Sequence, residues 1–509
     1  MNQLVPLGLA VLIALAGIGT AAAQETKYLA FQIFEGAPDP VIPFDASPLV
    51  YTPADKVAAI ANEIVTTIGV TGGTNAKLAV ILGPIAFDHT DAEARQIIAD
   101  GFAIALAENI AVGFHLDESM YWSKRTDLTS DPANVEWTDF AGTLSTGLQI
   151  DWARPSGARM CFNTPAIQAE VTRRARDVIG AEIAAQVASL PADKKHLFSG
   201  IITGWETHMG QDVGTGTRLG YHALANRGFS STNPPPNLNT EIESIVAEFI
   251  GRWTDGLAQA GIDPARIYTH VAFLTHARYD EFVTAGMVNP AVVTYETMVN
   301  RERSTQHPSV AFVANSRPGF STYPGVGQFD QIQEERALHA MPAWASAEGA
   351  NSLGGAPGDS GMSMETYLAR CFNPGATLVD VFGWGIGGTF VTNNPYRLAT
   401  EDPAALDAYR KFLNGQTLVE GAVNHAPVAS AQHVTTAQNT ATPITLMATD
   451  LNGDPLTYMI VTAPANGTLT GTGASRTYTP ATNYIGADSF TFKASDGAMD
   501  RSPPPWQSR

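Results

Sequence analysis

The run Leu197-Phe-Ser-Gly-Ile-Ile-Thr-Gly-Trp-Glu206 is a short apolar segment that ends in a carboxylate. A second run, Met341-Pro-Ala-Trp-Ala-Ser-Ala-Glu348, has the same form. Short apolar runs are typical of strands that are buried on both faces of a parallel sheet. A carboxylate is costly to bury, so its place at the end of such a strand indicates a functional edge. The two runs therefore predict a sheet whose carboxyl edge carries Glu206 and Glu348.

Outward from these runs, residues 25–420 alternate apolar segments with amphipathic ones. Helical spacing of apolar residues separates the apolar runs, and Thr90-Asp-Ala-Glu93 is a capping box that predicts the start of one helix. Eight strands that alternate with helices close a (β/α)8 barrel, whose active sites lie at the carboxyl ends of the strands. We therefore expect an α/β chain with a TIM barrel over 25–420. The predicted strands are 28–34, 77–84, 110–116, 197–206, 266–273, 309–315, 341–348 and 377–384.

Composition changes near Asn424, where the chain becomes rich in Thr, Asn and Pro and loses helical spacing. Asn-Gly and Asp-Gly turn signals recur at intervals that suit a β-sandwich. The pieces Ala448-Thr-Asp-Leu-Asn-Gly-Asp-Pro-Leu-Thr-Tyr458, Pro464-Ala-Asn-Gly-Thr-Leu469 and Asn483-Tyr-Ile-Gly-Ala-Asp-Ser-Phe-Thr-Phe492 closely resemble bacterial cadherin-like and Ig-like repeats, and they occur in that family's order. This resemblance implies a C-terminal all-β sandwich over 424–500.

Residues 501–509 depart from that family. Three consecutive prolines stand where the family has a last strand, and proline cannot donate to a sheet ladder. We therefore expect an aberrant tail without function, as a shifted reading frame would produce.

The N-terminus carries an export signal. Residues 4–18 are almost wholly apolar, and the small residues Thr20-Ala-Ala-Ala23 follow. The apolar stretch is shorter than a membrane-spanning helix needs. Residues 1–23 therefore predict a cleaved signal peptide and a secreted or periplasmic bacterial protein that is not inserted into a membrane.

The balance of charge restricts the partners. The chain of 509 residues has a formal net charge of −19, whereas nucleic acids and anionic membrane surfaces require clustered Lys and Arg. We expect a carbohydrate substrate and no nucleic acid, and no cofactor for catalysis. The two cysteines, Cys161 and Cys371, either pair in an exported protein or remain buried thiols, and the sequence leaves both alternatives open.

Glu206 and Glu348 lie on the fourth and seventh predicted strands, which face each other across a barrel of eight. A retaining glycosidase needs two carboxyls about 5–5.5 Å apart, one as nucleophile and one as acid/base. The alternative is that one or both form structural ion pairs. Aromatic residues at the same predicted face favour a carbohydrate, because sugar rings stack on aromatic faces. These candidates are Trp122, Trp205, Trp344 and Trp384.

This layout is similar to that of the clan-A retaining glycoside hydrolases, over residues 25–420. The resemblance implies that Glu206 is the acid/base and Glu348 the nucleophile. It also implies that Tyr323 orients the nucleophile. The chain departs from the clan at Trp205, because the clan usually has an Asn there that contacts the sugar 2-hydroxyl.

Three more polar residues lie on predicted strands or at their ends. Asp117 and its neighbour His115 either bind substrate hydroxyls or belong to a loop cap or ion pair. His270 is either a sugar ligand or a satisfied core histidine. In the C-terminal domain, four oxygen-bearing side chains predict either a Ca²⁺ site or an Asx-rich turn without an ion. They are Asp450, Asn452, Asp454 and Asp496.

The sequence thus predicts a secreted retaining glycoside hydrolase that acts on a polysaccharide or oligosaccharide. We expect its C-terminal domain to contact a cell surface or a polysaccharide. Two alternatives stay open: a non-catalytic carbohydrate-binding or cell-surface adhesion protein, and an inverting hydrolase or polysaccharide lyase. The separation of the two carboxyls distinguishes a retaining from an inverting hydrolase.

Overall fold

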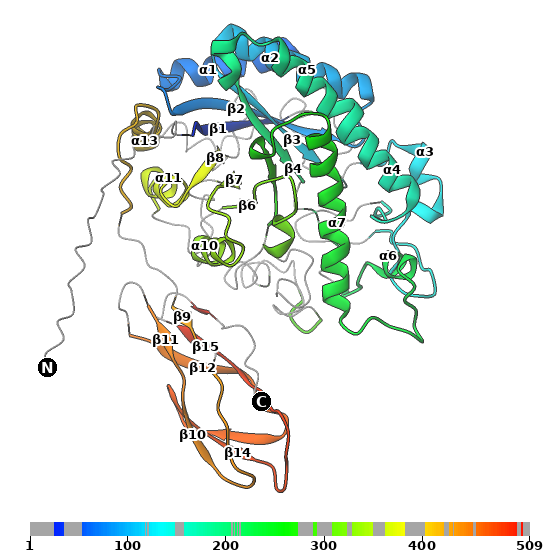
Figure 1. Ribbon diagram of the computed structural model, residues 1–509, viewed down its shortest axis with the longest axis vertical. Coiled ribbons are helices and arrows are strands. Elements are labelled where there is room, and N and C mark those ends of the chain that lie inside the picture. The colour runs from blue at the N-terminus through cyan, green and yellow to red at the C-terminus, as the bar shows by residue number, and fades with distance from the viewer. Residues whose placement is uncertain are drawn as a thin grey trace, which may run out of the picture.

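A barrel followed by small antiparallel sheets makes up the computed structural model of the chain (Figure 1). The structure describes residues 25–34, 53–117, 119, 122–147, 157–204, 207, 209–210, 212, 215–272, 283, 289–292, 308–322, 328–349, 362–381, 403–421, 427–430, 432–450, 455–495 and 500–501.

Eight parallel strands form the barrel. Strands that are consecutive in sequence are neighbours in the sheet, from β1 to β5 in one direction and from β1 through β8 to β6 in the other. Residues 267–271 and 317–321 exchange four backbone hydrogen bonds of 2.8–3.1 Å, which join β5 to β6 and close the ring. The predicted (β/α)8 barrel is confirmed. The strands are β1 (Lys27–Phe34), β2 (Ala76–Ala86), β3 (Ala111–Asp117), β4 (Phe198–Thr203), β5 (Ile267–Thr269), β6 (Gly319–Ser321), β7 (Trp344–Gly349) and β8 (Ala376–Val381).

Helices surround the strands (Figure 1). The predicted capping box is present at the second long helix, where the Thr90 N–H donates to Glu93 Oε2 at 2.7 Å and the Glu93 N–H donates to Thr90 Oγ1 at 3.2 Å. A π-helical segment, Arg174–Gly180, joins α4 to α5. The helices are α1 (Ala54–Ile68), α2 (Asp91–Glu108), α3 (Thr126–Thr129), α4 (Pro165–Arg173), α5 (Ala181–Ser189), α6 (Tyr221–Asn226), α7 (Leu238–Gln259), α10 (Gln328–Leu338), α11 (Met364–Phe372) and α13 (Pro403–Leu413).

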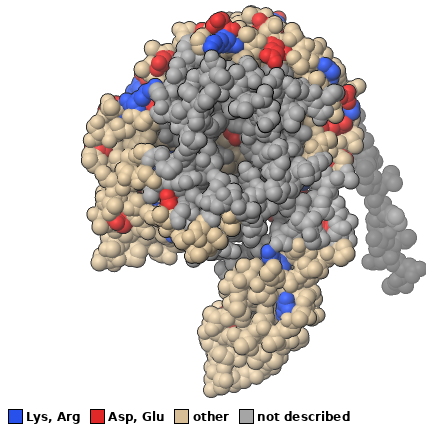
Figure 2. Space-filling view, turned by 180° about the vertical axis from the view of Figure 1, so that it is seen from behind, with Lys and Arg blue, Asp and Glu red and all other residues tan. Residues whose placement is uncertain are grey.

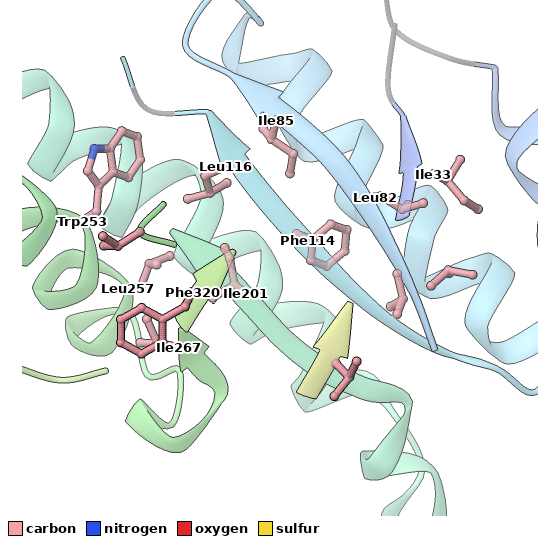
Figure 3. Packing of buried hydrophobic residues seen from close by; sticks show 14 of the residues in the cluster. Ile33, Leu82, Ile85, Phe114, Leu116, Ile201, Trp253, Leu257, Ile267 and Phe320 are labelled. Carbon is pink, nitrogen blue, oxygen red and sulfur yellow. The ribbon is translucent and has the colours of Figure 1, made fainter. Parts of the chain in front are cut away.

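The outward faces of the strands form the main hydrophobic core with the helices. Figure 3 shows Leu116, Ile201 and Phe320 of the strands close to Trp253 and Leu257 of α7, and all five side chains are buried. Burial of apolar surface on this scale supplies the favourable free energy that holds the helices to the sheet.

Two glycines let α7 approach the π-helical segment closely. A Cβ at Gly256 would lie 2.6 Å from the Cβ of Ala175, and a Cβ at Gly180 would lie 2.6 Å from the Cβ of Ala260. Carbon atoms cannot approach so closely, so only glycine permits this contact.

The inward faces of the strands fill the lower barrel with small and apolar side chains. All of them are buried, so the barrel is a packed core and not a pore. The cluster consists of Tyr28, Ala30, Ala79, Ile81, Ala111, Ile202, Tyr268, Ala345, Ala347 and Leu378.

The predicted sixth strand is misplaced. Residues 309–315 were expected to form it, but Pro308–Ala311 is a 3-10 turn and β6 lies at Gly319–Ser321. Val310 and Ala311 are fully buried. The apolar run therefore reflects the burial of a turn. The periodicity of apolar residues does not by itself distinguish a buried turn from a buried strand. The fifth strand is also shorter than the predicted 266–273. Cys161 and Cys371 are both buried and free.

The C-terminal strands pair antiparallel in three small sheets, as expected for a sandwich. Ile444, Leu446, Phe490 and Phe492 are the large buried side chains of its core. Arg501, the first residue of the predicted tail, still pairs with Ala494. The strands are β9 (Val428–Ala429), β10 (Thr442–Thr445), β11 (Ala448–Thr449), β12 (Thr457–Thr462), β13 (Gly467–Thr470), β14 (Ser475–Pro480), β15 (Thr491–Ser495) and β16 (Asp500–Arg501).

Charged side chains of both signs are interspersed on the face shown in Figure 2, and no basic patch forms on the part of it that the structure describes. Within the described ranges, no helix is both long enough and apolar enough to cross a membrane.

The barrel interior should carry much of the stability. Leu378→Ala removes a fully buried side chain, so we expect it to lower the free energy of unfolding by about 2–5 kcal/mol. Leu338→Ala is the matched control, because Leu338 is 74% exposed and should change stability by less than about 0.5 kcal/mol. Urea unfolding followed by tryptophan fluorescence measures both, since seven of the eight tryptophans lie between residues 122 and 384. Equal effects of the two changes would contradict a packed barrel interior.

Candidate active site

Polar side chains replace apolar ones at the carboxyl ends of the barrel strands. Six of them point into the barrel, and we call this set the polar layer. All six are at most 6% exposed. Barrel enzymes keep their active sites at this end, so the polar layer is the candidate active site. Its members are Gln32 of β1, His115 of β3, His270 after β5, Ser321 of β6, Glu348 of β7 and Asp380 of β8.

Glu348 reaches the polar layer because of a β-bulge. Ala345 and Ala347 point into the barrel, so strict alternation along β7 would turn Glu348 outward. Consecutive residues of β6 instead pair with residues of β7 that are two apart, which leaves one extra residue in β7. Glu348 thereby pairs with Ser321, whose side chain points inward, and takes the same direction.

The two imidazoles form the centre of a hydrogen-bonded chain. Nε2 of His115 lies 3.1 Å from Nδ1 of His270 and 2.9 Å from the carbonyl oxygen of Gly204. The other nitrogen of His115 lies 3.3 Å from Gln32 Oε1, and that of His270 lies 2.8 Å from Ser321 Oγ. Both rings are therefore fixed in position from two sides.

Burial keeps both imidazoles neutral. Loss of solvation lowers the pKa of His115 to about 3, against a weaker opposite effect of the Gly204 carbonyl. Burial also lowers the pKa of His270 well below its usual value, and the neighbouring His115 adds to the effect. At neutral pH each ring therefore has one protonated and one unprotonated nitrogen.

Glycine makes room for His115. A Cβ at Gly83 would lie 2.6 Å from the Cβ of His115 on the neighbouring strand. Gly204 has a φ of 99°, a conformation that favours glycine, and its carbonyl accepts from the His115 ring. Both glycines therefore support the imidazole pair.

Asp380 is the most buried carboxyl group of the layer. Leu378 belongs to the interior cluster, whereas Val379 and Val381 pack outside, so alternation turns Asp380 inward. Its side chain has no exposed surface, and among the described residues neither oxygen has a hydrogen-bond partner. Burial raises the pKa of Asp380 well above its usual value, and the charge of Glu348 raises it further. Burial therefore favours the protonated form of Asp380.

The structure brings together three of the predicted site residues, His115, His270 and Glu348. Asp117 ends β3 two residues beyond His115 on the same face and is 1% exposed. Glu206, Trp205, Tyr323 and Trp384 lie outside the described residues, and their predicted roles stay predictions.

Two of the predicted sugar-stacking residues, Trp344 and Trp122, do not line the polar layer. Trp344 is the first residue of β7, at the strand's opposite end from Glu348, and it is fully buried beneath Arg336. Trp122 is 3% exposed, and its Nε1–H donates to the carbonyl of Ala158 at 2.9 Å. Neither ring offers a free face on which a sugar could stack.

Of the four predicted calcium ligands, the structure describes Asp450, which lies directly after β11. The other three candidate ligands lie outside the described residues. These are Asn452, Asp454 and Asp496.

Sequence reasoning missed three members of the layer: Gln32, Ser321 and Asp380. Asp380 and Gln32 carry a readable signal, because each is a polar residue inside an otherwise apolar run. Ser321 had no such signal, since its strand was predicted elsewhere.

Another buried carboxyl group lies in the long insertion after β3. Glu136 is fully buried, and its Oε1 accepts from the backbone N–H groups of Trp137 at 2.9 Å and His222 at 2.6 Å. Burial raises the pKa of Glu136 to about 7, although these donors oppose the shift. Because the carboxyl group ties the insertion to α6, we interpret Glu136 as structural.

One family model matches the chain. Residues 424–503 match the bacterial Ig domain, which confirms the Ig-like prediction for the C-terminal region. No curated protein matches the chain.

Solved structures show only weak likeness. An endo-fucoidan hydrolase from glycoside hydrolase family 107 has 10% identity and a TM-score of 0.30, over 96% of this chain and 67% of that one. A GH31 dextranase of Flavobacterium johnsoniae has 9% identity and a TM-score of 0.32, over 91% of this chain and 59% of that one. Likenesses of this size carry no argument about function.

The protonation of Asp380 gives a pH-dependent effect on stability. A raised pKa means that the folded chain keeps a proton that the unfolded chain releases above about pH 3.9. The free energy of unfolding therefore falls as pH rises through that value. Asp380→Asn removes this cost, so we expect it to stabilise the protein at pH 7 by about 1.4 kcal/mol for each unit by which the pKa is raised.

Urea unfolding of the wild type and Asp380→Asn between pH 4 and pH 8, in the presence of a chelator, measures this difference. The stabilisation should shrink toward pH 4. An Asn variant that is less stable than the wild type at pH 7 would show that Asp380 is ionised in the folded protein.

Proposed function

We propose that the protein is a secreted bacterial glycoside hydrolase that acts on a polysaccharide or oligosaccharide with retention of configuration. The observation that carries the proposal is the orientation of Glu348, which a β-bulge turns into the polar layer at the carboxyl end of the barrel. Glu348 is 6% exposed, whereas Asp380 and both imidazoles have no exposed surface. Glu348 is thus the titratable member of the layer that substrate can reach.

In the proposed reaction, the Glu348 carboxylate attacks the anomeric carbon and the glycosidic C–O bond breaks. A carboxylic acid protonates the leaving oxygen, and we assign this role to Glu206. Water then attacks the anomeric carbon of the glycosyl-enzyme, and Glu206 accepts the proton of that water. The bond between the sugar and Glu348 breaks, which releases the Glu348 carboxylate.

The polar layer is suited to a nucleophile of this kind. A carboxylate attacks only in its ionised form, and two carboxylates side by side would oppose each other's ionisation. Protonation of Asp380 removes this repulsion. The neutral imidazoles add no positive charge that would bind Glu348 in an ion pair.

The other domains would serve delivery and attachment. We assign residues 1–23 to export and the C-terminal Ig domain to contact with a polysaccharide or a cell surface, with Ca²⁺ as a ligand of the segment from Asp450 to Asp496. The alternatives have distinct outcomes. A carbohydrate-binding or adhesion protein would bind sugars without turnover, an inverting enzyme would invert configuration, and a lyase would give unsaturated products.

Replacing the nucleophile should abolish hydrolysis. A panel of plant and microbial polysaccharides first identifies a substrate by release of reducing sugar. Glu348→Ala should then lower kcat by several orders of magnitude, because no glycosyl-enzyme forms. Azide should partly restore turnover of an activated aryl glycoside, and the azide product should have the configuration opposite to the substrate.

Asp117→Ala is the control for this experiment. A side chain that only binds a sugar hydroxyl should cost about one to three kcal/mol, which is roughly ten- to a hundredfold in kcat/KM. Near-normal activity of Glu348→Ala together with an inactive Asp117→Ala would place the nucleophile on β3 and refute the assignment.

The sandwich should not take part in the chemistry. Its strands form an antiparallel unit with a core of its own, so a chain that ends after residue 420 should keep its kcat on a small soluble substrate. Circular dichroism confirms that the shortened chain is folded. A folded but inactive barrel would mean that the sandwich completes the active site.

A further inference from the structure

We propose that the polar layer is a binding site for a divalent transition-metal ion, with Zn²⁺ as the best-suited ion. His115, His270 and Glu348 supply three ligand atoms, and we assign Asp380 of the neighbouring strand as the fourth ligand. This inference goes beyond the proposed hydrolase and does not depend on it.

The first argument is geometric. One nitrogen of His115, one nitrogen of His270 and one carboxylate oxygen of Glu348 all lie within 4.8 Å of one another, and the three side chains are buried. A contraction of each atom toward a common centre would produce the bond lengths of about 2.0–2.2 Å that Zn²⁺ takes with imidazole and carboxylate. Two nitrogens and carboxylate oxygens suit Zn²⁺ better than Ca²⁺ or Mg²⁺, which prefer oxygen ligands alone.

The second argument concerns the ring nitrogens that do not face each other. Metal-bound histidines usually donate their other N–H to an oxygen, which fixes the tautomer. Here Nδ1 of His115 lies 3.3 Å from Gln32 Oε1, and Nε2 of His270 lies 2.8 Å from Ser321 Oγ. Nε2 of His115 also donates to the Gly204 carbonyl at 2.9 Å, so binding would shift the His115 proton to Nδ1 and break this hydrogen bond. Nε2 of His115 and Nδ1 of His270, which are 3.1 Å apart, would then present their lone pairs to the same space.

The third argument is the buried carboxyl group of Asp380, which indicates a bound cation independently of the histidines. Its carboxyl group has no exposed surface, and within the described ranges neither oxygen has a hydrogen-bond partner. Buried carboxyl groups are normally paired, hydrogen-bonded or bound to a metal. Asp380 lies on the strand next to Glu348, and the two are close enough for the charge of Glu348 to act on it. A cation between them would satisfy both.

Charge balance favours an ion of charge +2. Two neutral imidazoles and two carboxylates give the ligand set a charge of −2. A cation of charge +2 would neutralise this charge, while each imidazole keeps one proton.

The ion would also act on the proposed reaction. A carboxylate of Glu348 that is bound to a metal cannot attack an anomeric carbon, so the ion should inhibit a retaining hydrolase that uses Glu348. This consequence allows the metal site and the hydrolase to be tested separately.

The test is calorimetric titration of the full chain, freed of metals with a chelator and then dialysed, with Zn²⁺. His115→Gln, His270→Gln and Asp380→Asn each remove one ligand and keep a polar side chain. His339→Gln is the matched control, because His339 is an exposed histidine on the outside of the barrel, stacked on Phe312. Circular dichroism confirms that each variant is folded.

We expect one Zn²⁺ per chain, with an affinity at least tenfold lower in each of the three ligand variants but unchanged in His339→Gln. Asp380→Asn is expected to fold even if a histidine variant does not, so it keeps the test decisive. Absence of saturable binding in the wild type, or equal affinity in the wild type and Asp380→Asn, would overturn the metal site.

Hydrolysis measured with and without Zn²⁺ separates the two proposals. Inhibition by one equivalent of Zn²⁺, reversed by a chelator, supports both. Activity that requires Zn²⁺ supports the metal site and refutes Glu348 as nucleophile. Hydrolysis unaffected by Zn²⁺ in a chain that binds no ion refutes the metal site and leaves the hydrolase standing.

Discussion

Closure of the eight-stranded ring is the constraint on which the rest of the structure depends. Once β5 and β6 pair, every inward side chain is enclosed by strands on all sides and reaches solvent only at the ends of the barrel. Apolar and small residues fill the lower part without cost. Polar residues at the upper end are largely withdrawn from solvent, so any of their polar groups that stays unpaired is costly.

The polar layer follows from that enclosure. Its imidazoles are neutral because burial makes a charged ring expensive, and they meet the need for hydrogen bonds through each other, Gly204, Gln32 and Ser321. The carboxyl groups differ because one of them is fully enclosed and the other lies at the mouth. The same set of groups is the basis of both proposals, with Glu348 as the nucleophile of a hydrolase and with the imidazoles and carboxyl groups as ligands of a cation.

The bulge in β7 links this chemistry to the backbone. Without one extra residue, Glu348 would point toward the helices, where a carboxylate would lie in the hydrophobic core. The bulge therefore determines whether the polar layer contains Glu348. Bulges that redirect a side chain next to an active site are a recurrent feature of sheets.

The architecture and several local features could be predicted from the amino-acid sequence. The barrel was identified from its apolar runs and from the capping box at Thr90, and the Ig-like sandwich from the repeat pieces after Asn424. These signals can be read because burial and turn formation depend on residues that are close in the chain. The prediction of the sixth strand was wrong, because the apolar residues Val310 and Ala311 lie in a buried 3-10 turn and not in a strand. Which side chains share a layer follows from the pairing of strands that are distant in sequence. The direction of Glu348 depends on pairing with β6, and the raised pKa of Asp380 depends on its burial in the closed barrel and on the charge of Glu348, so neither follows from residues that are close in the chain.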